Sequence, residues 1–291
     1  MAEHVDFELD WASGADIGFK LGAINVSDIA AMGGTPTRAV ATLQLGAQTS
    51  TVLIDDIVSG LIEAATRWDF GIVGGDIGRG SDLALTMTLL GEVEGQPILR
   101  SGARAGDAIC VTGALGASRA GLMALQLGAV ASETVHDEIE SRSGANGLAV
   151  LAARQLRPIP RLAEGRALRA HATAMIDISD GFALDLERLC KASNTGCAVD
   201  SSAIPLHPEL HHAAGVMERL PDPLELALTG GEDFELLFTV PPERIEEVQG
   251  VIDELGTEVS VVGKMTGEDR LIDDRALSEW SKHGWDHLRT Q

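Results

Sequence analysis

The stretch AMIDISDGFALDLERLCKAS, residues 174–193, joins a strand-like segment to a helical one without a separate loop. We expect the strand over residues 174–181 and the helix over the remainder. Alternation along the strand places Asp177 and Ser179 on one side. Ser179 or Asp180 then falls at the helix N-cap, where both residue types are preferred and where backbone N–H groups also favour anions. The stretch therefore fits a metal–phosphate site and simple helix capping equally well.

Strand-like and helix-like segments alternate on both sides of this stretch. Helical spacing over residues 17–32 stops at Gly33-Gly34, and residues 37–45 alternate like a strand. A Gly-Gly turn and a strand are expected within residues 226–241. The remaining expectations are helices over 51–68, 116–128 and 243–255, and strands over 71–73, 83–93, 108–113 and 259–265. Such mixing in both halves indicates an α/β or α+β fold.

The chain changes texture at residues 100–107, where RSGARAGD consists of polar turn residues. We place a domain boundary there, which gives an N-terminal domain over 1–103 and a C-terminal domain over 104–291. Two prolines make RPIPR, residues 157–161, a rigid connector. The polar segment 129–147 is expected to form a loop or a mobile helix.

Composition excludes several classes of function. The 291 residues include 22 Lys+Arg and 44 Asp+Glu, a net charge of -22, and there is no Tyr. Such a surface repels nucleic acid and anionic membranes, and it offers few rings for stacking bases.

No apolar run approaches the roughly 20 residues of a membrane span. The spacing of Cys110, Cys190 and Cys197 fits neither a zinc site nor a disulfide framework, and the start has no signal-peptide core, so we expect a cytoplasmic protein.

Two further short motifs contain carboxylates. Asn25 and Asp28 are three residues apart in the first expected helix and share a face. They fit a functional site, and the alternative is a helix carboxylate in a local hydrogen bond. Gly74-Gly75-Asp76 follows a short strand, where open sheets place ligands, although the same string is common in plain turns. Glycines there would allow backbone to approach a ligand closely.

The three motifs together supply Asp28, Asp76, Asp177 and Asp180. If these carboxylates converge, each like-charged pair about 4 Å apart costs on the order of 4 kcal/mol at an effective dielectric of 20, so cations or protons must neutralise them. Oxygen ligands without His or Cys favour Mg²⁺, which commonly also binds phosphates. The chain has neither a P-loop nor a G-x-G-x-x-G motif, so a nucleotide site here would be of another kind.

The ordered motifs resemble the thiamine-monophosphate kinase family, within the superfamily of aminoimidazole ribonucleotide synthetase. The resemblance covers almost the whole chain and rests on NVSDIAAMGG (25–34), GIVGGDIGRG (71–80), ILRSGARAGD (98–107), VTGALG (111–116), RPIPR (157–161), MIDISDG (175–181) and LTGGEDFELLFTVP (228–241). It implies an N-terminal α/β domain whose sheets pair across a homodimer, a C-terminal α/β domain, and an active site in the cleft between them.

The resemblance also implies roles for individual residues. Magnesium ligands would be Asp28, Asp76, Asp177 and Asp180; ATP contacts would be Gly75, Asp76, Arg100 and Ser179; contacts to the thiamine part would be Glu232 and Trp285. Trp285 could attract a cationic heterocycle by a cation–π interaction, and could equally be a C-terminal packing anchor. Arg100 could equally be a solvated hinge arginine.

Two departures from the family pattern concern the start of the chain. The family has a Gly-Asp-Asp segment and a Thr-Asp strand that would precede Met1, so we expect a truncated N-terminal domain and weak activity. The family histidine that touches the substrate pyrimidine is replaced by Asp6, with His4 two residues away on the same strand face.

The expected reaction is Mg²⁺-assisted transfer of a phosphoryl group from ATP to thiamine monophosphate, giving thiamine diphosphate. The acceptor oxygen is already anionic, so no general base is needed; alignment and charge neutralisation would involve Asp180 and Arg100 as catalytic residues. The alternatives are another ATP-using enzyme of the superfamily, or a non-catalytic nucleotide-binding remnant.

Overall fold

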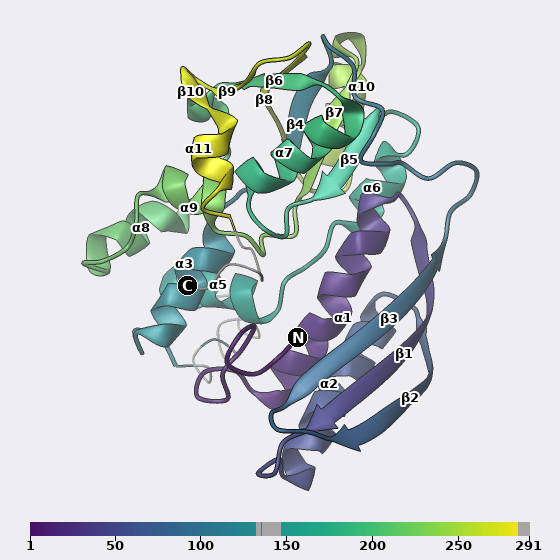
Figure 1. Ribbon diagram of the computed structural model, residues 1–291, viewed down its shortest axis with the longest axis vertical. Helices are drawn as coiled ribbons and strands as arrows, with labels where there is room; N and C mark the ends of the chain where they lie inside the picture. Colours follow the sequence, from purple (N-terminus) through teal and green to yellow (C-terminus); the bar gives the residue numbers. More distant parts are fainter. Residues whose placement is uncertain (132–134, 136–146, 285–291) are drawn as a thin grey trace.

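The computed structural model describes residues 1–131, 135 and 147–284, and in that part the chain forms two sheets with helices packed on them (Figure 1). The fold is an α/β two-domain fold, as the alternating sequence segments indicate. No helix in these residues is both long and apolar enough to span a bilayer.

The first sheet is small and has one open face. Among the described residues its order is β2-β1-β3, with β1 (Thr35–Leu45) parallel to β2 (Gly71–Arg79) and antiparallel to β3 (Ala84–Glu92). Helices α1 (Gly14–Ala31) and α2 (Thr51–Arg67) pack on one face (Figure 1). The buried side chains Ala39, Ala41 and Leu43 alternate along β1 and point to these helices, so the intervening side chains lie on the uncovered face.

Local signals account for the ends of the first helix. Ser13 caps α1: its hydroxyl accepts a hydrogen bond from the Asp16 N–H at 3.1 Å, and the Asp16 carboxylate reaches back in a capping box. After the helix, Gly33 takes a left-handed φ of 67° and its N–H bonds to the carbonyl of Ala30. The expected helix over 17–32 is therefore confirmed, with its start three residues earlier.

The prediction that the strand beginning at Gly71 ends at Val73 is wrong, and Gly74-Gly75-Asp76 is neither a strand end nor a turn. Strand β2 continues to Arg79 because its backbone pairs with β1 along its whole length, with one bulge at Val73. A Cβ on Gly75 would lie 2.0 Å from the carbonyl oxygen of Ala41, so this glycine allows close approach of two strands instead of a turn.

The second sheet belongs to the C-terminal half and is mixed. Its order in the described residues is β10-β9-β6-β8-β4-β7-β5. The strands are β4 (Ala108–Thr112), β5 (Ala174–Asp177), β6 (Gly196–Val199), β7 (Leu236–Val240), β8 (Val259–Thr266), β9 (Arg270–Ile272) and β10 (Arg275–Ala276). The helices are α3 (Ala117–Gln126), α5 (Gly147–Leu156), α6 (Leu162–Leu168), α7 (Phe182–Ser193), α8 (Glu209–Val216), α9 (Pro223–Thr229), α10 (Ile245–Asp253) and α11 (Leu277–Ser281). Most of segment 129–147 lies outside the described residues.

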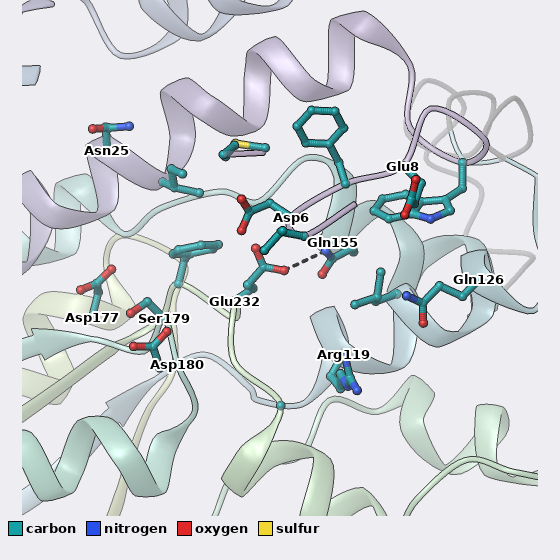
Figure 2. Close-up of a pocket in the computed structure, with 18 of the residues that line it drawn as sticks. Asp6, Glu8, Asn25, Arg119, Gln126, Gln155, Asp177, Ser179, Asp180 and Glu232 are labelled. Atoms are coloured by element: carbon teal, nitrogen blue, oxygen red, sulfur yellow. Dashed lines mark hydrogen bonds between the residues drawn. The ribbon is translucent and has the colours of Figure 1, made fainter. Parts of the chain in front are cut away.

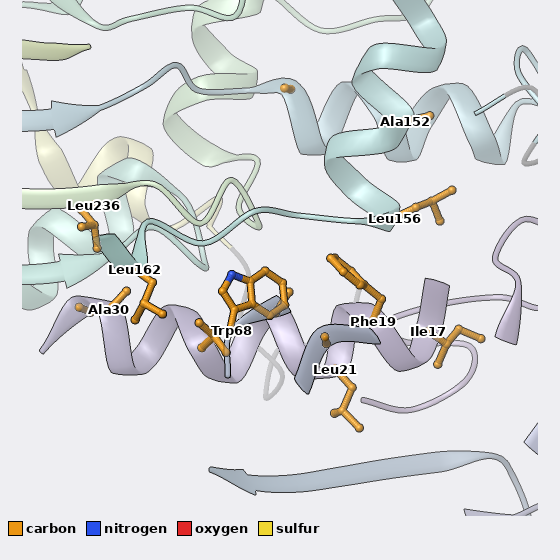
Figure 3. Close-up of a cluster of buried hydrophobic side chains, with 14 of the residues drawn as sticks. Ile17, Phe19, Leu21, Ala30, Trp68, Ala152, Leu156, Leu162 and Leu236 are labelled. Carbon is orange, nitrogen blue, oxygen red and sulfur yellow. The ribbon is translucent and has the colours of Figure 1, made fainter. Parts of the chain in front are cut away.

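Alternation along the strands separates two hydrophobic clusters. On β4, Ile109 and Val111 face a cluster formed with α7, while Ala108 and Cys110 face a larger cluster that continues into the N-terminal half. In that larger cluster Phe19 and Trp68 have ring centroids 5.2 Å apart. Figure 3 shows these rings between α1 and Leu156 of α5, so α1 contributes to the packing of both halves.

The RPIPR segment connects the two halves through its two arginines. The Arg157 guanidinium lies over the Phe19 ring at 4.1 Å and pairs with Asp16 at 3.3 Å. Arg161 donates two hydrogen bonds of 2.6 Å to the two carboxylate oxygens of Glu235, which directly precedes β7. The bidentate geometry fixes the connector against the second sheet, in agreement with its prediction as a rigid segment.

Candidate active site

A pocket of about 360 Å³ lies between the N-terminal segment, α1, α3 and the loops after β5 and α9 (Figure 2). Its lining is strongly acidic, with one guanidinium, Arg119. The six carboxylates that line it are Asp6, Glu8, Asp28, Asp177, Asp180 and Glu232. An acidic pocket of this kind suits a ligand that brings its own positive charge or metal ions.

Two of the sequence motifs meet at this pocket. Ser27 of α1 is buried, and its hydroxyl donates a 2.7 Å hydrogen bond to the Asp177 carboxylate at the end of β5. Asp28 and Asn25 line the pocket on the same face of α1, as their spacing predicts. The 150 residues that separate Ser27 from Asp177 are therefore bridged by one hydrogen bond between the two halves.

The proximity of these carboxylates changes their proton affinity. The pKa of Asp28 is raised to about 6, mainly because surrounding protein excludes solvent and secondly because of the charge of Asp177, while Arg100 opposes the shift. Burial also raises the pKa of Asp177, although the Ser27 hydrogen bond and the charge of Arg100 work in the other direction. A bound cation would relieve the same repulsion.

The loop after β5 is organised by a carboxylate that the sequence analysis did not identify. Neither Ser179 nor Asp180 caps α7; the N-cap is Gly181, with φ 111°, and it makes no side-chain capping bond. The buried Asp185 instead accepts hydrogen bonds from the N–H groups of Ser179 (3.0 Å) and Asp180 (2.9 Å). The capping prediction is wrong because the carboxylate that binds these N–H groups belongs to Asp185, within the first turn of α7, and not to a residue before the helix.

Asp180, which precedes α7, forms an ion pair with Arg188 of that helix. Nη1 of Arg188 lies 2.5 Å from Asp180 Oδ2 and 2.7 Å from Asp185 Oδ1. The burial of Asp185 raises its pKa to about 7 even with this guanidinium beside it. Arg188 thus neutralises part of the acidic wall of the pocket.

The Gly-Gly-Glu-Asp-Phe turn lies directly beside the Asp177–Asp180 loop and is conformationally strained. Glu232 (φ 58°) and Phe234 (φ 50°) both adopt left-handed backbone conformations, which cost roughly 1–3 kcal/mol each for non-glycine residues. Backbone hydrogen bonds join Glu232 N–H to the Ser179 carbonyl (2.8 Å) and Phe234 N–H to the Ile178 carbonyl (2.9 Å). The turn is therefore fixed against the Asp177–Asp180 loop, and Glu232 is directed into the pocket (Figure 2).

Glu232 and Asp233 engage different partners. One carboxylate oxygen of Glu232 lies 2.8 Å from the Lys20 ammonium, and the other accepts a 2.8 Å hydrogen bond from the Gln155 amide. Asp233 turns away and accepts from the N–H groups of Gly116 (2.8 Å) and Ser118 (3.3 Å) at the start of α3. Solvent exclusion raises the pKa of Asp233 to about 7.

Known proteins match this chain over most of its length. Two family models match, AIR synthase related protein, N-terminal domain, over residues 1–93, and AIR synthase related protein, C-terminal domain, over residues 104–274. The thiamine-monophosphate kinase of Rhodopirellula baltica is 37% identical over 281 residues, which cover 96% of this chain and 77% of the relative. The chain belongs to the thiamine-monophosphate kinase family.

Solved structures of this family have the same fold. The thiamine monophosphate kinase from Aquifex aeolicus matches with 29% identity and a TM-score of 0.81, covering 95% of this chain and 86% of that one. A structure described as AaThiL complexed with AMPPCP and TMP has 30% identity and a TM-score of 0.84, covering 99% and 85%. The hydrogenase maturation protein HypE, at 18% identity and a TM-score of 0.65, shares the fold.

The residues expected from the family pattern lie in three places. The pocket is lined by Asp6, Asp28, Asp177, Ser179, Asp180 and Glu232. Arg100 does not line it, but its charge acts on Asp28 and Asp177. Gly75 and Asp76 lie on β2 outside the pocket, and Trp285 lies outside the described residues.

The position of Asp76 follows from strand alternation. It pairs with Thr42, which is exposed on the face of the small sheet that α1 and α2 leave open. The expectation that Asp76 joins the other three carboxylates in one pocket is therefore not met within a single chain. The expectation holds for Asp28, Asp177 and Asp180.

The donor set fits a metal that is bound partly by substrate. In residues 1–131, 135 and 147–284, no three His, Cys, Asp or Glu side chains are arranged to hold a metal ion on their own. Asp28 and Asp177 are nevertheless close enough to raise the pKa of Asp28. Mg²⁺ is commonly held by one or two carboxylates together with water and phosphate oxygens, so this pair is compatible with it.

Several site residues carried no usable signal in the sequence. Lys20 lies on α1 one to two turns before the Asn25–Asp28 motif but is not part of it, Gln155 lies in a helical segment far from the acidic motifs, and Asp185 and Arg188 belong to a helix with an ordinary amphipathic pattern. Ser27 alone could have been found, because it stands between Asn25 and Asp28 on a helix already expected to face a site.

Proposed function

We propose that this chain transfers the γ-phosphoryl group of ATP to the phosphate of thiamine monophosphate, with Mg²⁺, and so forms thiamine diphosphate. The observation that carries the proposal is the meeting of Asp28 and Asp177–Asp180 in one pocket with Glu232, in a chain of this family. Support for the substrates comes from the related structure with AMPPCP, an ATP analogue, and TMP.

The residues of the pocket have distinct parts in this reaction. Asp28, Asp177 and Asp180 would hold Mg²⁺, which when bound neutralises phosphate charge. Arg100, whose field already acts on two of these carboxylates, would contact the transferred phosphoryl group, and Ser179 would contact ATP. Glu232, Asp6 and Trp285 would contact the thiamine part. Because the acceptor phosphate is already anionic, the protein mainly aligns the two phosphates and excludes water.

The proposal extends to the assembly and location of the protein. The uncovered face of the β2-β1-β3 sheet supports a homodimer, because a sheet face normally packs against another layer. Gly75 and Asp76 lie on or beside that face and would reach ATP in the assembled enzyme. We also propose domains over 1–103 and 104–291 and a cytoplasmic location.

The test is formation of thiamine diphosphate from thiamine monophosphate and ATP, followed by chromatography with and without Mg²⁺. We expect Mg²⁺-dependent product with the unaltered chain and a loss of at least about a hundredfold in kcat for Asp177→Asn, the size typical of removing one group that stabilises transition-state charge. Leu255→Gln, an exposed position on the far side of the C-terminal half, serves as the matched control. ATP consumption without thiamine diphosphate would contradict the proposal.

A further inference from the structure

Behind the pocket wall, a buried ammonium group that the reaction itself does not require contacts Glu232. The Lys20 side chain is only 5% exposed, and its Nζ lies 2.8 Å from Glu232 Oε1 without the angle of a regular hydrogen bond. Lys20 belongs to α1 in the N-terminal half, whereas Glu232 belongs to the strained turn of the C-terminal half. A buried lysine is costly unless an anion lies beside it.

Glu232 is the counter-ion that remains available to Lys20. Asp16 lies one turn earlier on α1, but its carboxylate accepts from the Ser13 hydroxyl at 2.7 Å and pairs with Arg157 at 3.3 Å. Asp6 lines the same small cavity as Lys20, but its carboxylate accepts a 2.7 Å hydrogen bond from the Ala2 N–H. Lys20 is therefore matched with Glu232.

A second arm holds the other oxygen of the same carboxylate. The Gln155 amide donates to Glu232 Oε2 at 2.8 Å, and its own carbonyl accepts a 2.5 Å hydrogen bond from the Ser118 hydroxyl. Ser118 of α3 and Gln155 of α5 are both buried, and Figure 2 shows the hydrogen bond from Gln155 to Glu232. One carboxylate oxygen of Glu232 thus contacts the Lys20 ammonium, the other accepts from Gln155, and both keep lone-pair capacity toward the pocket.

We infer that Lys20 is a positioning residue for substrate binding: together with Gln155 it fixes the Glu232 carboxylate so that this group accepts a hydrogen bond from an amino group on the heterocycle of the substrate. The inference rests on the proposed function, since thiamine monophosphate carries such an amino group on its pyrimidine ring. It also explains how a left-handed Glu232 stays in place, because two partners from different elements determine its position.

The charge of Lys20 has a separate consequence. Six carboxylates line the pocket, and Lys20 offsets one of them from beneath without occupying the space of the ligand. Removing the ammonium would leave Glu232 repelled by its neighbours and free to rotate. Such a rotation moves the acceptor away from its position, whereas the backbone at Ser179 and Asp180 keeps its own support from Asp185.

The experiment compares Lys20→Met, Lys20→Arg and the control Lys264→Met, an exposed lysine on β8. For Lys20→Met we expect the KM and the calorimetric Kd for thiamine monophosphate to rise at least about tenfold, equivalent to about 1.4 kcal/mol, with the KM for ATP changed less than about twofold. Lys20→Arg should restore part of the loss, and Lys264→Met should behave as the unaltered chain. An unchanged Kd for thiamine monophosphate in folded Lys20→Met would overturn the inference.

A stability cycle keeps the test decisive if Lys20→Met folds poorly. Glu232→Gln removes the charge that Lys20 matches. The double variant should therefore lose less free energy of unfolding than the two single variants lose in sum. Additive losses would show that the pair is not coupled and would overturn the inference. If the unaltered chain neither binds nor phosphorylates thiamine monophosphate, the proposed function fails, and the cycle still reports separately on the Lys20–Glu232 pair.

Discussion

At the scale of single residues, the Asp180 carboxylate already contacts a cation, the guanidinium of Arg188 at 2.5 Å. The proposed metal ion would have to displace this partner or share the carboxylate with it. Arg188 should therefore lower the repulsion among the carboxylates of the pocket at the expense of metal affinity.

Arg188→Gln should accordingly bind Mn²⁺ more tightly in the absence of nucleotide, by up to roughly fivefold, since a partly exposed ion pair is worth about 0.2–1 kcal/mol. Electron paramagnetic resonance titration of free Mn²⁺ measures this directly. Lys191→Gln, on the same helix and paired with Glu187, is the matched control. Equal Mn²⁺ affinity in all three proteins would show that Arg188 does not compete with the metal.

A second residue-scale prediction concerns His207. Burial and the charge of Arg154 lower the pKa of this histidine to about 4. The folded state then binds fewer protons than the unfolded state between about pH 4 and 6.5, so stability falls as the pH is lowered through this range. At pH 5 the cost is about 2 kcal/mol for a group with these two pKa values. His207→Asn, which can still accept from the Glu209 N–H, should lose less stability than the unaltered chain between pH 7.5 and pH 5 in urea titrations. A parallel loss in both proteins would contradict the assignment.

At the scale of elements, the sequence predicts the structure where one residue's neighbours along the chain decide the outcome. Helix α1 begins at a capping box and ends at a left-handed glycine, and both are local signals. The end of strand β2 could not be predicted at Gly74-Gly75-Asp76, because pairing with a distant strand overrides the turn preference of two glycines. The Asp185 support of the Ser179–Asp180 backbone could not be predicted either, because a carboxylate on a helix does not reveal which loop it will meet.

Packing of α1 on α2 illustrates why such contacts escape prediction. A Cβ on Gly18 would lie 1.9 Å from the carbonyl oxygen of Ile57, and one on Gly60 would lie 1.9 Å from that of Ala15. We expect Gly18→Ala to destabilise the protein by about 2–4 kcal/mol through backbone overpacking, although alanine is the better helix former by about 1 kcal/mol. Gly250→Ala on α10, which has no atom near its Cβ position, should instead be neutral or stabilising. Urea unfolding of both variants decides whether the close helix crossing or the intrinsic propensity dominates.

At the scale of the whole molecule, the site consists of two halves that could be recognised separately in the sequence but not placed relative to each other. The motifs around Asp28 and Asp177 are both visible in the sequence, but their meeting is seen in the structure, in the buried Ser27–Asp177 hydrogen bond and in the shared pocket. Asp76 is the remaining case. Its motif resembles the family pattern as well as the others do, but alternation puts it on the open face of the small sheet.

The last prediction concerns that open face. Val40 and Leu90 are 46% and 61% exposed on it, and we expect two copies to pack there, giving a particle of twice 30.5 kDa in light scattering. Val40→Lys would place a charge in the middle of the interface and should shift the protein toward monomer, whereas Val52→Lys, on the exposed side of α2, should leave the mass unchanged. Because Asp76 lies on the same face, we expect both Asp76→Asn and the Val40→Lys monomer to bind Mg-ATP more weakly than the unaltered chain. The free energy of unfolding of Val40→Lys at low concentration should stay close to that of the Val52→Lys control. A monomeric Val40→Lys protein with full Mg-ATP affinity would show that nucleotide binding does not depend on dimer formation at the open face.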